Sequence, residues 1–534
     1  MTDDTAATEV PFTVASELGH PPPPADAGPG AIARRSVWGL LAQVTPLAVN
    51  IGLSPYVIHG FGLDRYGLFL LITGLATLLG SFDGGITASA QRYFSIYAGA
   101  GDKHATTRLL CTTTTLVGAA GLVIAAAMWA LATPITHLLT MPPQLGGETV
   151  FLLRVSAVIL VGALLRNVPA AILQAHNRFA LTNLTYALSY GIYVAGIILT
   201  VHNQWGLRGA ALTIAAQQVV ATIVIVPSSL QYLTRSGVGF YSRPELRELF
   251  AFSAKMQSVS IAQLFLAEVD GMIIAALLPV RNVALYTAGA GFSEQIRTVP
   301  SNALGPMQTA LAHSYAQRGE EGLYPEFEKL QRTWVLGITG WCAAATGAAY
   351  FGVTSWLGHG SNEFHVSGIV ATVLLVGVFA MLGTRVLSTT LTVLGHPGFQ
   401  ARLSIMMVIV NISLTACLVW FGPVGVVAAT TLSQIAGVVY LEHSVRRRHP
   451  VRMRSFVHDV PVLAYLVTIA TVFALEVLIH PYVPYGAVGL LSCAVPAMFG
   501  LLVYAHIALP RETRHRVYGR VWSTAARLIP GRAA

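Results

Sequence analysis

The chain has little charge and little cysteine. Only 10% of its 534 residues are Asp, Glu, Lys or Arg, against about 25% in soluble proteins. All four cysteines lie in apolar runs and none belongs to a CxxC pair, so we expect small buried apolar side chains and neither disulfides nor a metal site. They are Cys111, Cys342, Cys417 and Cys493. The histidines form no cluster with ligand spacing either. This composition excludes a soluble multidomain enzyme.

Other signals are also missing. No GxxxxGK[ST] loop is present, so we expect no nucleotide cofactor. Residues 1–33 are acidic and proline-containing and lack a basic segment followed by an apolar one, so they predict a disordered cytoplasmic tail and not a cleaved signal peptide. The formal charge of +9 is scattered between apolar runs, which argues against a nucleic-acid partner.

Long apolar runs dominate what remains. The sequence is 54% hydrophobic with a mean hydropathy of +0.63, and a membrane span needs about 20 apolar residues. We therefore predict an all-α integral membrane protein with about fourteen spans. The predicted spans are Ser36–His59, Tyr66–Tyr97, Thr107–Ala132, Val150–Gln174, Thr182–Val201, Gly209–Tyr232, Ala251–Leu278, Val283–Ala316, Trp334–Trp356, Ser367–Leu394, Ala401–Phe421, Val424–His443, Val460–Ile479 and Val483–Ile507.

Basic residues predict the orientation of these spans. Alternating loops place nearly all Lys and Arg on one side, while the other side receives only Arg65, Arg208 and Arg281. By the positive-inside rule, both termini are cytoplasmic and the protein lies in the cell (cytoplasmic) membrane. Residues 509–534 suggest a basic amphipathic helix on anionic membrane lipids, or an ordinary topology anchor.

The chain repeats itself. The segment from Arg65 to Phe69 resembles the segment from Asn282 to Tyr286, and Gly206 with its neighbours resembles Gly422 with its neighbours. Two parallel six-helix repeats predict a V-shaped, two-lobe transporter with two extra C-terminal helices. The predicted units are the tail 1–33, an N-terminal lobe 34–232, a cytoplasmic linker 233–250, a C-terminal lobe 251–445, spans thirteen and fourteen in 446–508, and the tail 509–534.

Three pieces carry a family resemblance. They are GLDRYGLF from Gly62 to Phe69, DGG at Asp83 with RYF at Arg92, and the unit EVDGMII from Glu268, VALY from Val283 and AQRG from Ala316. Together they resemble Wzx-type polysaccharide flippases of the multidrug/oligosaccharidyl-lipid/polysaccharide (MOP) exporter superfamily, which includes the lipid II flippase MurJ and the MATE transporters.

The resemblance implies alternating-access transport of a lipid-linked glycan on a polyprenyl diphosphate, without enzymatic activity. A glycan polymerase or glycosyltransferases are the implied partners. A MATE-like ion-coupled drug exporter and a MurJ-like lipid II flippase are the alternatives. A membrane glycosyltransferase or polymerase is disfavoured because every loop is short.

Charged residues inside spans are candidate site residues, because they usually face a cavity or a partner. We predict that four arginines contact the diphosphate head group of the lipid-linked glycan, since planar guanidinium groups match phosphoryl oxygens. They are Arg297, Arg92, Arg166 and Arg385. Arg92, Arg166 and Arg385 could instead snorkel or join the lobes. Arg154, near a span end, is expected to snorkel.

The acids predicted for ion coupling or gating are Asp270, Asp83, Glu294 and Glu268. Glu294 lies one turn before Arg297, which predicts either an intrahelical ion pair or a cavity pair. Asp270 could carry H⁺ or Na⁺, or be satisfied by Arg92 or Lys255. Asp83 and Pro300 lie at matching places in the repeats, where we expect both helices to break.

Overall fold

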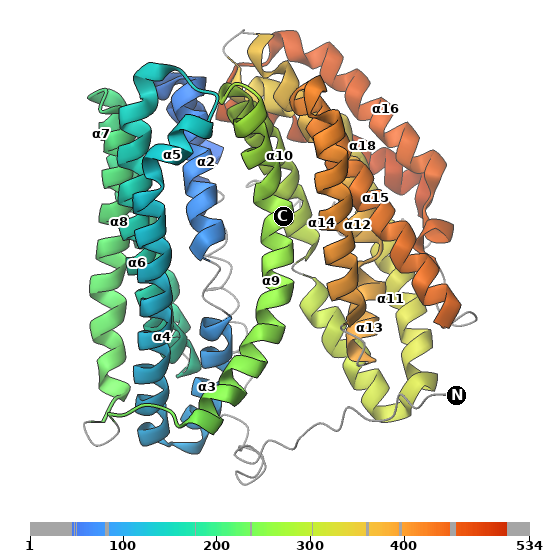
Figure 1. Ribbon diagram of the computed structural model, residues 1–534. Coiled ribbons are helices and arrows are strands. Elements are labelled where there is room, and N and C mark those ends of the chain that lie inside the picture. Colours follow the sequence, from blue (N-terminus) through green and yellow to red (C-terminus); the bar gives the residue numbers. More distant parts are fainter. Residues whose placement is uncertain are drawn as a thin grey trace, which may run out of the picture.

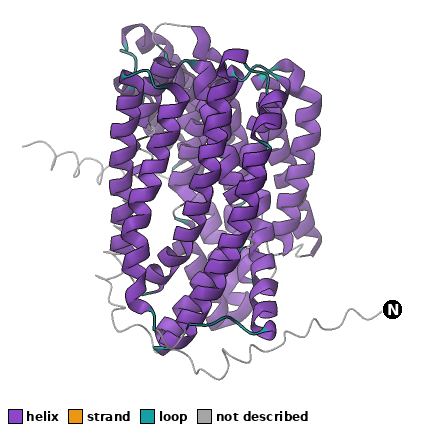
Figure 2. Ribbon diagram, turned by 60° about the vertical axis from the view of Figure 1, so that its left-hand side comes forward, coloured by secondary structure: helices purple, strands orange, loops and turns teal. Residues whose placement is uncertain are grey.

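The computed structural model describes residues 45–46, 48–49, 51–80, 85–176, 178–234, 238–301, 303–358, 362–394, 398–448 and 455–509. The described chain is helical and contains no strand (Figure 2), which confirms the predicted all-α fold. Eleven of its helices are long and apolar enough to cross a membrane, so the protein is a multi-pass membrane protein and the number fourteen is not confirmed. The tail 1–33, residues 510–534 and Asp83 lie outside the described residues.

The helices form two lobes side by side, with a hairpin outside the second lobe (Figure 1). The N-terminal lobe contains α2 (Leu63–Gly80), α3 (Ile86–Ala100), α4 (Lys103–Ala130), α5 (Ala132–Leu138), α6 (Gly146–Ala175), α7 (Phe179–His202) and α8 (Gly206–Ser229). Residues 51–61 precede it as a helix.

The C-terminal lobe is longer. It contains α9 (Arg243–Leu277), α10 (Arg281–Ser301), α11 (Leu304–Leu357), α12 (His365–Gly383), α13 (Arg385–Val393), α14 (Gly398–Leu418) and α15 (Pro423–Arg448). The hairpin consists of α16 (Val462–Ile479), α17 (Ala487–Ser492) and α18 (Ala494–Ala508). One apolar core extends through both lobes, and a smaller one lies between α3, α4 and α6.

Several predicted spans are interrupted. The second is divided between α2 and α3, the eighth between α10 and α11, and the tenth between α12 and α13. The interruptions after Gly80 and Ser301 lie where matching breaks were predicted. The reversal at Gly319, whose φ is 61°, turns α11 back on itself, so α11 completes the eighth span and forms the ninth. Cys417, predicted to be buried, is exposed on α14, on the surface of the bundle.

Matching contacts mark the two repeats. Arg65 pairs with Glu148 at 3.1 Å, 83 residues later, and Arg281 pairs with Glu363 at 3.5 Å, 82 residues later. Positive φ angles recur at Gly101 and Gly319 and at Gly206 and Gly422. These matches support the predicted parallel repeat at the level of individual residues.

The lobes meet where α2 and α10 begin. A Cβ atom on Gly67 of α2 would lie 2.4 Å from the carbonyl oxygen of Val280, so only glycine allows this approach. The backbone of Thr140 also accepts a hydrogen bond from the Val280 N–H at 3.0 Å and donates one to the Ala275 carbonyl at 3.2 Å. The form described here is therefore closed at the end that carries Arg65 and Arg281.

Helix α9 belongs to both lobes. It begins at Arg243, eight residues before the predicted lobe boundary, and crosses from the lower end of the N-terminal lobe to the upper end of the C-terminal lobe (Figure 1). Its lower part packs on α3, where Ser253 Oγ donates to Ser89 Oγ at 2.8 Å. A Cβ on Gly85 would lie 2.5 Å from the Ser253 carbonyl. The upper part packs against α14 and α10.

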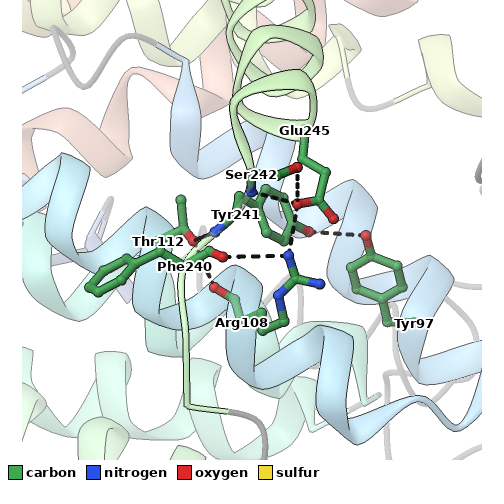
Figure 3. Close-up of polar contacts among 7 residues, drawn as sticks. All are labelled: Tyr97, Arg108, Thr112, Phe240, Tyr241, Ser242 and Glu245. Carbon is green, nitrogen blue, oxygen red and sulfur yellow. Dashed lines mark hydrogen bonds and ion pairs between the residues drawn. The ribbon is translucent and has the colours of Figure 1, made fainter.

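The segment before α9 is fixed to α3 and α4 (Figure 3). Arg108 Nη2 donates to Glu245 Oε2 at 2.7 Å, and the Ser242 N–H donates to the same oxygen at 2.6 Å. The Tyr241 N–H donates to Thr112 Oγ1 at 2.9 Å, and the Tyr241 hydroxyl lies 3.0 Å from that of Tyr97. These bonds form a linker anchor, here defined as Arg108, Thr112, Tyr241, Ser242 and Glu245.

Protonation of Glu245 should weaken the linker anchor. Burial alone would raise the pKa of this carboxyl, but the hydrogen bonds from Ser242 and the Arg108 charge hold it below its ordinary value of 4.5. A lowered pKa stabilises the folded state above about pH 4.5, and this stability is lost as the pH falls through the folded-state pKa.

We expect Arg108→Gln to lower the free energy of unfolding by about 0.2–1 kcal/mol at pH 7, the usual value for a part-exposed ion pair. Thermal unfolding of the purified protein and the variant between pH 7 and pH 3 checks this. The two melting temperatures should converge below about pH 4.5. A constant difference across that range would contradict the assignment.

Candidate functional site

A polar cavity of about 520 Å³ lies between α2 and the C-terminal lobe. Its walls come from α2, α9, α10 and α12 to α15. Five of the eight predicted site residues line it: Glu268, Asp270, Glu294, Arg297 and Arg385. We refer to it as the C-lobe cavity.

Arg297 and Glu294 form a pair within the C-lobe cavity. Arg297 Nε donates to Glu294 Oε2 at 2.8 Å, and its Nη2 donates to Oε1. The two side chains remain 38% and 50% exposed. The pair is thus intrahelical and also faces the cavity, so both interpretations of the sequence apply.

Arg385 lies directly after the break at Thr384 between α12 and α13. Its Nε is buried and has no hydrogen-bond partner among the described residues. The side chain is close enough to interact electrostatically with Arg297 and with Glu294. Two guanidinium groups therefore line one cavity, but only that of Arg297 is paired with a carboxylate.

Gln434 of α15 lines the same cavity and has a matching residue in the other lobe. It follows Gln218 by 216 positions, the same separation as between Gly206 and Gly422. In the N-terminal lobe, Arg166 Nη1 donates to Gln218 Oε1 at 2.7 Å. In the C-terminal lobe, the Gln434 Oε1 atom is buried without a partner in the described structure. The glutamine oxygen thus accepts a hydrogen bond from an arginine in the N-terminal lobe and has no partner in the described C-terminal lobe.

Asp270 lies in a cluster of neutral polar side chains. The Tyr286 hydroxyl and Thr430 Oγ1 each donate to Asp270 Oδ2 at 2.6 Å. Asn411 Nδ2 donates to Thr430 Oγ1 at 3.0 Å. Asp270 is 1% exposed, and its Oδ1 has no partner among the described groups. Its donors among the described residues are Tyr286 and Thr430. The side chains of the predicted partners Arg92 and Lys255 lie outside the described residues.

Glu268 also reaches the C-lobe cavity, from the other side of α9. A Cβ on Gly74 of α2 would lie 2.3 Å from Glu268 Oε2. Residues two apart cannot share a helix face, yet both Glu268 and Asp270 line the cavity, because it extends around α9 from α2 to α15.

One predicted residue lies away from this cavity, and two others fall outside the described structure. Arg166 is bonded to Gln218 inside the N-terminal lobe. The side chain of Arg92, on α3, and all of Asp83 lie outside the described residues. Among the parts of the chain that the structure describes, no group of three or more His, Cys, Asp or Glu residues could hold a metal ion.

The charged groups are ordered along the bundle. Asp270 lies seven residues before the end of α9 at Leu277, about 10 Å at 1.5 Å per residue. Arg385 lies twenty residues after the start of α12 at His365, about 30 Å from the same end. Arg297 is intermediate, sixteen residues into α10. The buried acid is thus near the closed end, and the two arginines lie farther from it.

Comparisons with known proteins agree with this geometry. Residues 102–356, from the start of α4 to the end of α11, match the family model described as polysaccharide biosynthesis protein. The lipid II flippase MurJ in an inward closed conformation has a similar structure, with a TM-score of 0.66 and 14% identity over 89% of this chain and 98% of that chain.

An inward-facing MATE transporter of the MOP superfamily aligns with a TM-score of 0.60 and 15% identity over 77% of this chain and 97% of that chain. The chain has the MOP-superfamily fold. A MOP-superfamily transporter from Pyrococcus furiosus aligns with a TM-score of 0.54 and 17% identity over 78% of this chain and 95% of that chain. No curated protein matches the sequence. The predicted resemblance to polysaccharide flippases of the MOP superfamily is confirmed.

Sequence reasoning missed the neutral residues of the C-lobe cavity and of the Asp270 cluster. Tyr286, Asn411, Thr430 and Gln434 carry no charge and are dispersed among many similar residues in apolar helices. One available signal was the pair of glutamines separated by 216 positions. The other was Tyr286, which lies within the quoted motif VALY.

Thr430→Val should destabilise the protein without changing the shape of the site. The substitution removes one of two hydrogen bonds to a buried carboxylate, which costs about 1–3 kcal/mol. Thermal unfolding of the purified protein measures the loss. Thr392→Val is the matched control, because Thr392 Oγ1 only donates to Ser388 of its own helix. Equal stability of the two variants would show that the Thr430 bond contributes nothing.

Proposed function

We propose that this protein transports a lipid-linked oligosaccharide, carried on a polyprenyl diphosphate, across the cytoplasmic membrane by alternating access. The observation that carries the proposal is the guanidinium of Arg385, which faces the C-lobe cavity beside Arg297 with its Nε unpartnered in the described structure. Planar guanidinium donors match the oxygens of a diphosphate. The match to a polysaccharide biosynthesis family supports the glycan.

In this mechanism the diphosphate binds Arg385 first and then competes with Glu294 for Arg297. Glu294 already forms two bonds to Arg297, so phosphate binding replaces one ion pair with another and leaves no guanidinium without an anion. Return of Glu294 to Arg297 then favours release. The glycan occupies the space between the lobes while the prenyl chain stays in lipid.

The form described here accepts cargo from the cytoplasm if the predicted orientation is correct. The lobes are in contact at the end that carries Arg65 and Arg281, which the positive-inside rule assigns to the outside. Topology reporters fused to either terminus test this assignment. Under the same orientation, a glycan polymerase or glycosyltransferases would act on the cargo before or after transport.

Asp270 is our candidate for the coupling-ion site. Its Oδ1 is buried and has no partner among the described residues. This oxygen and the nearby side chains of Asn411 and Thr430 offer oxygen ligands that suit Na⁺, while protonation of Asp270 is the H⁺ alternative.

A cationic cargo is the second candidate function. The described lining of the C-lobe cavity has three carboxylates and two guanidiniums, and Glu268 forms no ion pair with a described residue. A MATE-like exporter would use such a carboxylate for a cationic drug. A MurJ-like lipid II flippase would share the diphosphate site and differ only in the attached glycan.

Arg385→Gln should abolish transport. Deleting the gene should cause a lipid-linked glycan to accumulate on the cytoplasmic side, and complementation with Arg385→Gln should fail although the protein reaches the membrane. Arg166→Gln is the matched control, because Arg166 is bonded to Gln218 outside the C-lobe cavity, and it should complement. Drug sensitivity without glycan accumulation would instead support the exporter.

Asp270→Asn should uncouple transport from its ion. In vesicles, uptake of the accumulated glycolipid should depend on a Na⁺ or H⁺ gradient for the natural protein and on neither for the variant. A Na⁺ dependence that persists in a proton-conducting membrane would identify Na⁺. An unchanged ion dependence of Asp270→Asn would remove Asp270 from the coupling site.

A further inference from the structure

A second cavity lies on the N-terminal lobe, away from the transport site. It is an open groove of about 540 Å³ between α4 and α6, and all its lining residues are apolar. Leu122 and Trp129 of α4 form one wall, and Val158 of α6 belongs to the other. These three side chains are 61%, 48% and 61% exposed. Two small residues, Ala126 of α4 and Gly162 of α6, also line the groove. No residue of the C-lobe cavity takes part.

A cation lies beside Trp129 of this groove. The guanidinium carbon of Arg154 is 5.4 Å from the centre of the Trp129 ring. Arg154 Nε is buried and has no hydrogen-bond partner among the described residues. A cation in this position needs an acceptor, and the described structure provides none for this nitrogen.

The repeat shows what occupies the matching place in the other lobe. Gly101 and Gly319, which precede the matching helices, are 218 positions apart. The same separation places Leu122 opposite Gly340 and Trp129 opposite Gly347. A Cβ on Gly340 would lie 2.6 Å from Tyr504 of α18, and one on Gly347 would lie 2.8 Å from Val472 of α16. In the C-terminal lobe, the hairpin therefore covers this face (Figure 1).

The N-terminal lobe cannot bind a helix in the same way. Close helix packing in membranes relies on small residues at the contact, and here Leu122 and Trp129 replace the two glycines. Their exposed side chains occupy the positions where the two glycines leave room for the hairpin in the C-terminal lobe. In the C-terminal lobe, the positions that match Arg154 in the repeat are occupied by the apolar Ile369 and Val370 of α12. The charge is therefore also specific to the N-terminal lobe.

The dimensions fit one lipid chain. The α6 residues that line the groove run from Ala157 to Leu165. Arg154, about one turn before Ala157, is eleven residues from Leu165, which is about 16 Å. This is roughly half of the 30 Å hydrocarbon core, the depth of a single leaflet. A polyprenyl carrier is longer than this depth.

We propose that the α4–α6 groove is a binding site for an anionic phospholipid, with one acyl chain between Leu122, Trp129 and Val158 and its phosphate bound by Arg154. The phosphate oxygens supply the acceptor that Arg154 Nε lacks. Arg154 was expected to snorkel to the membrane surface, and in this proposal its end point is a bound phosphate. The site does not depend on the transport function.

Bromine on an acyl chain quenches nearby tryptophan, and Trp129 is in the groove, so fluorescence tests the proposal directly. The full-length protein is reconstituted in phosphatidylcholine vesicles and titrated with brominated phosphatidylglycerol or brominated phosphatidylcholine. The Trp129→Phe protein gives the signal of the other tryptophans. We expect the Trp129 fluorescence to be quenched at lower mole fractions of brominated phosphatidylglycerol than of brominated phosphatidylcholine.

Two variants locate the site. Arg154→Gln should weaken the preference for phosphatidylglycerol roughly tenfold, since a hydrogen bond to a charged group is worth about 1.5–3 kcal/mol. Gly162→Leu, which keeps the charge, should fill the groove and reduce quenching by both lipids. Arg208→Gln is the matched control, because Arg208 lies over Phe151, outside the groove, and it should behave as the natural protein.

Equal quenching by the two lipids, or an unchanged preference in Arg154→Gln, would overturn the proposal. The groove would instead bind a helix of another membrane protein if the Ala126→Cys variant cross-linked to such a protein while brominated phosphatidylglycerol gave no preferential quenching. That result would also overturn the proposal. None of these measurements requires transport, so failure of the proposed function leaves the test intact.

Discussion

A charged group within a bilayer needs a partner inside the protein, because lipid chains offer no hydrogen bonds. This constraint organises the described structure. Oδ2 of Asp270 accepts hydrogen bonds from two hydroxyls, Arg166 donates to an amide and Arg297 donates to a carboxylate. Arg385 and Arg154 each retain an Nε without a partner in the described chain. Both proposals concern these two exceptions, since an unsatisfied cation indicates an anion that comes from elsewhere.

The fold class and most of the charged site followed from the sequence. Apolar runs and the positive-inside pattern depend on local composition, so they predict helices and orientation well. A rare charge within a span is conspicuous, which is why five of the cavity residues could be named in advance. The break before Arg385 was not predicted, because tertiary packing and not a single residue type determines where a long helix divides.

The neutral residues could not be predicted for a different reason. Thr430 lies 160 residues from Asp270, and nothing in an apolar helix distinguishes this threonine from its neighbours. The two lobes also differ in chemistry despite their matching folds. Asp270 and Thr430 lie 216 positions after Ser54 and Ile214, so the N-terminal lobe has no carboxylate at the matching position. The two repeats thus share their helix arrangement, but only the C-terminal lobe has an acid at this position.

Helix α9 imposes a kinematic condition on the whole molecule. Its lower end is fixed to α3 and α4 by the linker anchor, and its upper end, which carries Asp270, is packed in the C-terminal lobe. Because one continuous helix is packed against both lobes, it restricts how the lobes can move relative to each other. Sliding and separation of the lobes are therefore restrained, and rotation about an axis near α9 is the motion that remains. Helix α9 thus connects the position of Asp270 mechanically to that of the linker anchor.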